Sequence, residues 1–226
     1  MYKILSYKLN RNAPGWPGCP KIDIQPMGQI TEGKRFNMYN VKLFNHFGSH
    51  MDAPRHFRED GPSISELSLD KFIYNSPVLI NIPKTFKEVV TIEDLAHYKS
   101  QIVNADLLMI KSGFSVYRSE QPVRYAEEGP GVSSEACKYL IEEFPNLKSI
   151  ALDCISLSSY ANDDGALAHE YLLGKFHDNY ICVIEDINMD GVTRDNIKKV
   201  FSIPLFIEGI DSSPVTVIAE LDDNFC

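Results

Sequence analysis

Short apolar runs separated by turn residues recur along the chain and predict strands. The runs at residues 77–82 and 106–111 are almost continuously apolar, which is typical of strands buried on both faces, and we expect the first to be central in a sheet. Residues 35–47 alternate between apolar and polar positions and predict a long strand that carries His46 at its end. Further strands are predicted at residues 3–9, 148–155, 180–184, 200–208 and 214–220.

Helix signals are fewer and lie between the predicted strands. Thr91 predicts an N-cap for a short helix that ends near an exposed His97, and Ser133 predicts the cap of a helix that reaches Phe144. Residues 167–174 predict a helical turn, and residues 112–132 predict a long loop over the functional site. This pattern predicts one domain over residues 1–226 of the mixed α/β or α+β class, and we expect α/β with a single mixed sheet.

Composition excludes several classes of function. A net charge of −9 disfavours binding to nucleic acid or to an anionic membrane surface. No stretch approaches the ~18 consecutive apolar residues that a membrane span requires. The five cysteines are far apart and form no C-x-x-C pair, so we expect a reducing, cytoplasmic location. A small molecule is then the expected partner.

Residues 45–56 are the stretch most suited to chemistry. Gly48 and Pro54 argue against a helix there, and in an extended chain side chains at i, i+4 and i+6 project to one side. Pro54 would then turn the chain and return the last histidine to that face. Imidazole and carboxylate groups are ligands for zinc, manganese and iron. The four even-numbered groups are His46, His50, Asp52 and His56.

The residues of this cluster are compatible with two interpretations. The groups could form a buried polar cluster without a metal, because a single histidine is more often a core or surface residue than a ligand. Four groups of one parity around a glycine favour a divalent metal site. Upstream, the only tryptophan, Trp16, lies in a rigid loop rich in proline and glycine, which is either an ordinary surface loop or one wall of a pocket for an aromatic substrate.

The cluster resembles a known family signature. In the cyclase-like metal-dependent hydrolases, which include bacterial kynurenine formamidases (arylformamidases) and isatin hydrolases, the signature reads H-x-G-T-H-x-D-x-P-x-H-F. The loop around Trp16 is similar to the family's P-x-W-P-G segment, and residues 130–133 are similar to its P-G-L-S helix start. Residues 168–173 and 184–185 resemble its late A-H-x-x-L-L and I-E segments. This chain's version of the signature is His46-x-Gly48-Ser49-His50-x-Asp52-x-Pro54-x-His56-Phe57.

The resemblance implies a role for each matching residue. His46, His50 and Asp52 would bind one metal ion, and Asp52 would bridge to a second ion held by His169 and Glu185. His56 would be the catalytic acid/base. The resemblance also implies a β/β/α-type fold of the cyclase/kynurenine formamidase type, and a homodimer or homotetramer in which a neighbouring subunit contributes to the pocket. The expected cofactor is zinc, with manganese as the alternative, at one or two ions per subunit.

Two departures from the family pattern affect these expectations. Ser49 replaces the usual threonine and keeps the hydroxyl, which we expect to contact a ligand or the substrate. The interval between His169 and Glu185 is longer than in the formamidases, so the second site is less secure and Glu170 or Asp186 could replace Glu185. Glu185 is preferred because it ends a predicted strand, whereas Glu170 would point off a different helical face.

The expected activity is hydrolysis of an amide or formamide C–N bond in a small aromatic substrate, with metal-activated water and His56 as general acid/base. One alternative is a hydrolase or cyclase that acts on another cyclic carbonyl compound, such as an isatin-like lactam or a lactone. Another is a catalytically silent metal-containing binding protein, which the free base His56 disfavours. A serine hydrolase is disfavoured because the chain has no G-x-S-x-G elbow.

Overall fold

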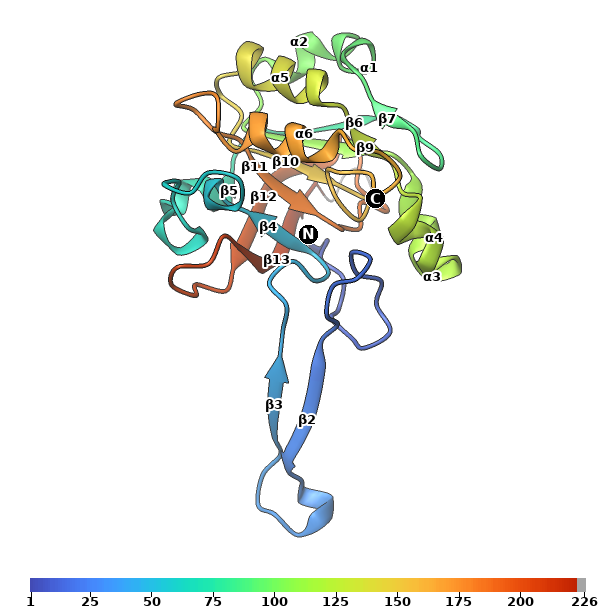
Figure 1. Cartoon of the computed structure of the whole chain (residues 1–226), viewed down its shortest axis with the longest axis vertical. Coiled ribbons are helices and arrows are strands. Elements are labelled where there is room, and N and C mark those ends of the chain that lie inside the picture. The colour runs from blue at the N-terminus through green and yellow to red at the C-terminus, as the bar shows by residue number, and fades with distance from the viewer. Residues whose placement is uncertain (223–226) are drawn as a thin grey trace.

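A mixed sheet forms the centre of the fold. The computed structural model describes residues 1–222, and within them nine strands join this sheet. They are β1 (Tyr2–Ile4), β4 (His50–Asp52), β5 (Ile73–Tyr74), β6 (Pro77–Asn81), β8 (Leu107–Lys111), β10 (Ser149–Leu152), β11 (Cys182–Glu185), β12 (Ile197–Pro204) and β13 (Ser212–Leu221). The spatial order is β5–β12–β13–β4–β11–β10–β8–β6, and β1 pairs with β13 (Figure 1). The mixed α/β class predicted from the strand pattern is confirmed.

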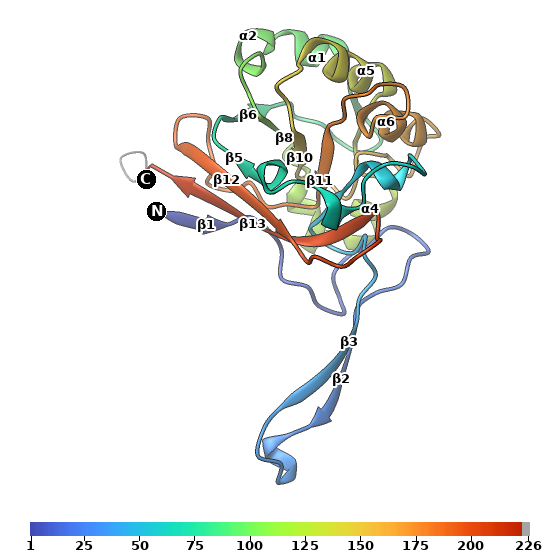
Figure 2. The same cartoon turned by 90° about the vertical axis from the view of Figure 1, so that its left-hand side faces the viewer.

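The sheet has a parallel half and an antiparallel half. Strands β6, β8, β10 and β11 are parallel, and β4, β13, β12 and β5 continue the sheet with antiparallel pairing. The sheet curls until β12 contacts β6, so it is nearly closed (Figure 2). Strand β6 ends the pairing order, so the prediction that residues 77–82 form a central strand is wrong. An apolar run indicates that a strand is buried but not where it lies in the sheet, and the apolar side chains of β6 are buried or half-buried at the end of the strand order.

Helices cover the outer face of the parallel half (Figure 1). The capped helices begin as predicted: Thr91 accepts a hydrogen bond from Asp94 N, and Ser133 accepts one from Ala136 N. No helix within residues 1–222 is long and apolar enough to cross a membrane. The helices are α1 (Ile92–Ala96), α2 (Lys99–Ile102), α3 (Tyr117–Glu120), α4 (Pro122–Glu127), α5 (Ser134–Glu143) and α6 (Gly165–Leu172).

The two faces of β8 explain its unbroken apolar run. The sheet separates two hydrophobic cores. Leu108 and Ile110 pack in the core on the side of the helices, whereas Leu107 and Met109 pack in the core inside the curled sheet. Both faces are therefore dry, and the strand needs no polar side chain along most of its length. The burial predicted for residues 106–111 is confirmed.

A two-stranded arm projects from this body (Figures 1 and 2). It pairs β2 (Asp23–Gly28) with β3 (Met38–Lys42), and every residue of β3 is exposed. The strand predicted over residues 35–47 is therefore too long, and His46 lies in a turn beyond it. The alternation of apolar and polar residues did indicate a strand, but that strand pairs with β2 in the arm and does not pack against a core.

The segment at residues 112–132 is mostly helical and contains α3 and α4, followed by β9 (Gly131–Val132), which pairs with β7 (Val89–Val90). Pro122 occupies the first turn of α4, where its missing N–H costs no hydrogen bond. None of these residues lines the cavity that contains His46, His50 and His169, so the predicted loop over the functional site is wrong.

Candidate functional site

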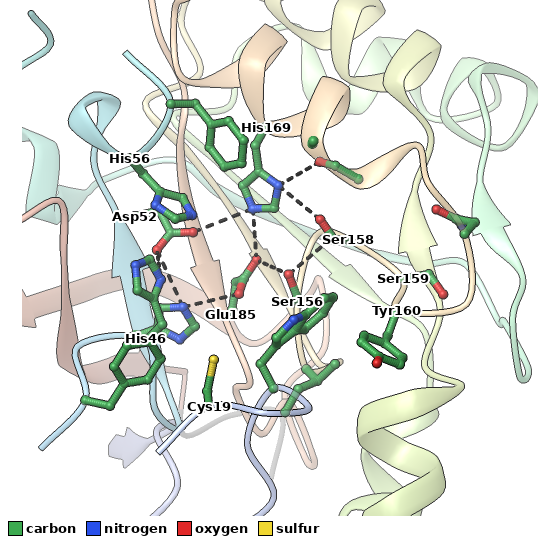
Figure 3. A pocket seen from close by; sticks show the side chains of 18 of the residues that line it. Cys19, His46, Asp52, His56, Ser156, Ser158, Ser159, Tyr160, His169 and Glu185 are labelled. Carbon is green, nitrogen blue, oxygen red and sulfur yellow. Dashed lines mark hydrogen bonds and ion pairs between the residues drawn. The ribbon is translucent and has the colours of Figure 1, made fainter. Parts of the chain in front are cut away.

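A cavity of about 520 Å³ opens beside the carboxyl ends of β10 and β11 (Figure 3). Loop residues at the ends of parallel strands converge there, as is common for sites in α/β sheets. Residues 156–165 supply much of one wall. Seven of the eight predicted site residues line the cavity: Trp16, His46, His50, Asp52, His56, His169 and Glu185.

Strand β4 presents two buried groups to the cavity. His50 and Asp52 are two residues apart and share a face of the strand, as the even spacing predicted. The Nδ1 of His50 lies 2.8 Å from the carbonyl oxygen of Gly48, which can only accept, so Nδ1 donates. The Nε2 of His50 is left facing the carboxylates of the cluster.

A turn, and no strand, brings His46 to the same place. Gly48 adopts φ +71°, a conformation that glycine takes at little cost, and β4 begins only at His50. The Nδ1 of His46 lies 3.1 Å from Oδ1 of Asp52. The prediction that these side chains share one face of an extended chain is thus correct for His50 and Asp52. His46 reaches the same place through the left-handed turn at Gly48.

Two groups from far downstream complete the cluster. His169, on α6, donates from Nδ1 to the carbonyl oxygen of Gly165 at 2.9 Å, and its Nε2 lies 3.7 Å from Oδ2 of Asp52. Glu185 ends β11 and lies 3.4 Å from that same Nε2. Its Oε1 is held by Ser156 Oγ at 2.9 Å and by the N–H of Leu157 at 2.6 Å.

The alternatives to Glu185 point elsewhere. Asp186 accepts a bidentate pair from Arg118, both contacts at 2.7 Å, and a hydrogen bond from the Tyr125 hydroxyl. Glu170 pairs with Lys175 outside the cavity. A positive φ of 54° at Asp186 turns the chain directly after Glu185. Of these three neighbouring carboxylates, Glu185 is the one that lines the cavity.

The charges of the cluster depend strongly on one another. Burial opposes protonation of His46, but its contacts with Asp211 and Asp52 outweigh burial and raise its pKa to about 10. For His169, contacts with Asp52 and Glu185 likewise outweigh burial and raise the pKa to about 10.

The carboxylates respond in the opposite direction. Burial alone would raise the pKa of Asp52, yet His50 and His169 hold it well below its usual range. Burial and the Asp52 charge oppose ionisation of Glu185, but His169 and His50 together outweigh them and lower its pKa. The cluster therefore favours ionised carboxylates and protonated histidines.

The donor set fits one or two divalent ions. Oδ1 of Asp52 is fully buried and has no hydrogen-bond partner among the described residues, which leaves a charged oxygen available. Ligands about 2.0 Å from a tetrahedral zinc lie about 3.3 Å apart, and the donor pairs of the cluster lie 3.1–3.7 Å apart. Oδ1 faces His46 and His50, while Oδ2 faces His169, so Asp52 has the geometry of a bridge.

His56 lies at the edge of the cluster after the turn that Pro54 begins. Pro54 starts a single 3₁₀ turn that ends at His56, as the predicted role of the proline required. The ring centroid of His56 is 4.3 Å from that of His46 and 5.7 Å from that of His169. His46, Asp52 and His56 also lie close enough together to hold an ion themselves.

Asp211 is a site residue that sequence reasoning missed. Its Oδ2 lies 2.7 Å from Nδ1 of His56 and 2.9 Å from Nε2 of His46, and Asn45 Nδ2 donates to its Oδ1 at 2.7 Å. These histidine contacts outweigh burial and lower the pKa of Asp211. It lies 155 residues after His56 and belongs to no spaced motif, so only its place before the apolar run at residues 214–220 could have drawn attention to it.

Aromatic side chains form the remaining wall of the cavity. Trp16 and Tyr160 meet edge to face with ring centroids 5.6 Å apart, and Phe57 stacks on His169. Ser49 does not line the cavity: its hydroxyl donates to the carbonyl of Asp186 and accepts from the N–H of Tyr7. The Ser49 side chain therefore connects the start of β4 to Tyr7 and Asp186. It does not face the cavity, so the predicted contact with a substrate is not made.

Comparisons with known proteins assign this chain to a family. A family model described as a putative cyclase matches residues 4–159. The chain belongs to the cyclase family. An uncharacterised protein of Haemophilus influenzae is 40% identical over 123 residues, which cover 54% of this chain and 87% of that protein. A kynurenine formamidase of Bacillus cereus is 26% identical over 214 residues, 95% of this chain and 94% of the relative.

A solved structure of an isatin hydrolase shows the same fold. Isatin hydrolase A from Labrenzia aggregata, bound to benzyl benzoate, superposes with a TM-score of 0.82 at 21% identity, over 97% of this chain and 93% of that one. At this identity the likeness establishes the fold alone. The nearly closed mixed sheet is therefore the architecture of this cyclase-family member, as the signature predicted.

Proposed function

We propose that this cyclase-family protein is a metal-dependent hydrolase that cleaves the C–N bond of an amide or formamide in a small aromatic substrate. The observation that carries the proposal is the buried Asp52 carboxylate, which has one oxygen without a hydrogen-bond partner and three imidazoles around it. A full-length relative is named kynurenine formamidase, which supports a formamide as the first substrate class to test.

We assign one metal position to His46, His50 and Asp52, and a second to Asp52, His169 and Glu185. When bound, a divalent ion, zinc or manganese, supplies Lewis-acid chemistry that activates water at neutral pH and polarises a carbonyl group. The protein contributes the orientation of these ligands. Backbone carbonyls hold the rings of His50 and His169, and Ser156 holds the Glu185 carboxylate.

His56 is assigned as the acid/base. Its Nδ1 is engaged by Asp211, and its Nε2 has no hydrogen-bond partner among the described residues. An imidazole held in this way can take a proton at Nε2 from water and return it to the leaving amine, which departs poorly as an anion. The aromatic wall around Trp16 suits a flat ring next to these groups.

Release of formate from an N-formyl aryl amine tests the proposal. The protein should release formate when its metal content, measured by elemental analysis, is at least one ion per chain. A chelator should abolish release, and added zinc or manganese should restore it. Isatin-like lactams and lactones tested in parallel separate the formamide assignment from a cyclic carbonyl substrate. A metal-loaded protein that turns over none of these compounds would contradict the proposal and favour a binding protein.

We also propose that a second copy of the chain covers the arm. Six of its apolar side chains are 46–61% exposed, and a two-stranded hairpin alone is at best marginally stable in water. Two symmetry-related arms would bring on the order of 1,000 Å² of side-chain surface into one interface, and the surfaces they cover raise the total to the ~1,200–2,000 Å² of stable complexes. The six are Met27, Ile30, Phe36, Met38, Tyr39 and Val41.

Size-exclusion chromatography coupled to light scattering tests whether the chain self-associates through the arm. The native chain should elute as a dimer or tetramer, and Phe36→Ser/Tyr39→Ser should shift it towards smaller species. Leu69→Ser, which removes an equally exposed apolar side chain away from the arm, is the matched control. A monomeric native chain would exclude the proposed self-association. The cytoplasmic location stays a prediction, and it is supported by four free cysteines among the described residues.

A further inference from the structure

One carboxylate links the two ends of the histidine cluster. Asp211 directly precedes β13, and its backbone carbonyl accepts a hydrogen bond of 2.9 Å from the N–H of Ala53, just after β4. Its side chain is thereby placed between two groups ten residues apart, His46 and His56. The same oxygen, Oδ2, contacts both rings, at 2.9 and 2.7 Å.

The identity of the contacting atoms decides the tautomers. A carboxylate has only lone pairs to offer, so the ring nitrogen that faces it must carry the proton in each histidine. His56 meets Asp211 through Nδ1, so its Nε2 bears the lone pair. His46 meets the same oxygen through Nε2, which therefore keeps its proton; its Nδ1, protonated against Asp52 in the metal-free chain, would bear the lone pair once a metal ion is bound.

These opposite tautomers suit opposite tasks. The Nδ1 of His46 donates to Oδ1 of Asp52 at 3.1 Å in the metal-free chain, and it would lose that proton to solvent and become a ligand when an ion binds between the two groups. The ring of His56 borders the cavity, where a free Nε2 is needed to accept a proton. Neither ring nitrogen that contacts Asp211 is available for either task.

We propose that Asp211 is a positioning residue that sets the tautomers of His46 and His56 together, so that one ring offers Nδ1 to the metal and the other offers Nε2 to the substrate. The roles of the two rings and the metal-bound tautomer of His46 rest on the proposed function, whereas the tautomer of His56 does not. Carboxylates that hold a metal-bound histidine typically contribute 10–100-fold to metal affinity or activity.

The neighbour Asn45 makes this testable. Asn45 Nδ2 donates to Oδ1 of Asp211 at 2.7 Å and to Ser212 Oγ at 2.8 Å, which fixes its amide. In Asp211→Asn the new amide must therefore turn its oxygen to Asn45 and its NH₂ to the two rings. Both histidines would then accept, and both tautomers would invert. Inversion of this kind in a catalytic triad lowers kcat about 10⁴-fold.

The double variant Asn45→Asp/Asp211→Asn should reverse the inversion. An aspartate at position 45 would accept from the NH₂ of the new amide, whose oxygen would again face the rings. Net charge is unchanged in the double variant, so the comparison isolates hydrogen-bond polarity. Asp70→Asn, an exposed aspartate far from the cavity, is the control for loss of one charge.

The experiment reads ring ¹⁵N signals of histidine-labelled, zinc-loaded protein together with kcat and KM on an N-formyl aryl amine. In the native chain the His56 signal should show a protonated Nδ1 and a bare Nε2. We expect Asp211→Asn to invert this signature and to lower kcat at least about 100-fold with little change in KM, and the double variant to recover most of the loss.

Several results would overturn the proposal. A native spectrum with the proton on Nε2 of His56 would do so without any variant, even if Asp211→Asn fails to fold. So would Asp211→Asn with native kcat, or a double variant that restores the tautomers without restoring kcat. A native chain that releases no formate in the presence of zinc contradicts the proposed function instead, and the ring signals still test the tautomers.

Discussion

Glu185 lies directly opposite His50 in the antiparallel register of β11 and β4, and its Oε2 is 3.3 Å from Nε2 of that ring. This pairing joins residues 135 positions apart at one end of the cavity. It also decides between neighbouring carboxylates, because Asp186 is turned away towards Arg118. The candidate centre therefore depends on strand register as much as on the histidine motif.

Glu185→Gln should lower the metal content of the protein. The amide keeps the shape of the side chain but removes the charge that faces His50 and His169, so we expect one of two ions to be lost or bound at least 10-fold more weakly. Glu170→Gln, only one residue from His169 but paired with Lys175, should leave metal content unchanged. Equal metal loss in both variants would contradict the assignment of Glu185.

His56→Ala should retain its metal and lose activity. A general acid/base contributes about 10²–10⁴-fold, so we expect kcat to fall within that range while elemental analysis shows the native metal content. His97→Ala, on an exposed face beyond α1, is the control. Because His56 also lies near His46 and Asp52, loss of an ion in this variant would identify it as a ligand and refute its assignment as the base.

Gly48→Ala should weaken the cluster through the backbone. The left-handed conformation costs a non-glycine residue about 1–2 kcal/mol, and the new Cβ would lie 2.4 Å from Cδ2 of Leu9. We expect a lower Tm together with weaker zinc binding, since this turn places both His46 and the ring of His50. Gly33→Ala has the same backbone cost in the arm with no atom within 4 Å, so it should lower Tm without affecting zinc affinity.

Trp16→Ala should raise KM more than it lowers kcat. The indole forms part of the cavity wall with Tyr160 and offers neither a metal ligand nor an acid/base group. Trp16→Phe should retain most of the affinity because it keeps a flat ring. As the only tryptophan, it also provides a fluorescence signal that an aromatic ligand should quench. Unchanged KM in Trp16→Ala would remove this residue from the substrate site.

Metal-free protein should lose stability as pH rises from about 6.5 to about 10. His46 and His169 have folded-state pKa values of about 10, above the ordinary value of about 6.5 in an unfolded chain. Their protonation therefore stabilises the fold fully below pH 6.5, and this contribution disappears as the pH passes the folded pKa. Thermal unfolding of the chelated protein measures the decline, and His169→Gln should make it shallower. A flat profile would contradict the raised pKa values.

Local sequence determined the part of the site that is contiguous. The even spacing at residues 46–56, the turn glycine and Pro54 restrict the backbone directly, so the ligand cluster and His56 could be predicted from the residues themselves. Helix caps at Thr91 and Ser133 are local for the same reason. The burial of β8 followed from its apolar run, because each strand face must meet a dry partner.

Tertiary structure decided what depends on distant segments. Periodicity says that β6 is buried but not that it ends the strand order, and it says that residues 38–42 are extended but not that they leave the body as an arm. The choice of Glu185 and the role of Asp211 depend on the register of β4 with β11 and β13. Register arises from the packing of the whole sheet, so no window of sequence around either carboxylate contains it.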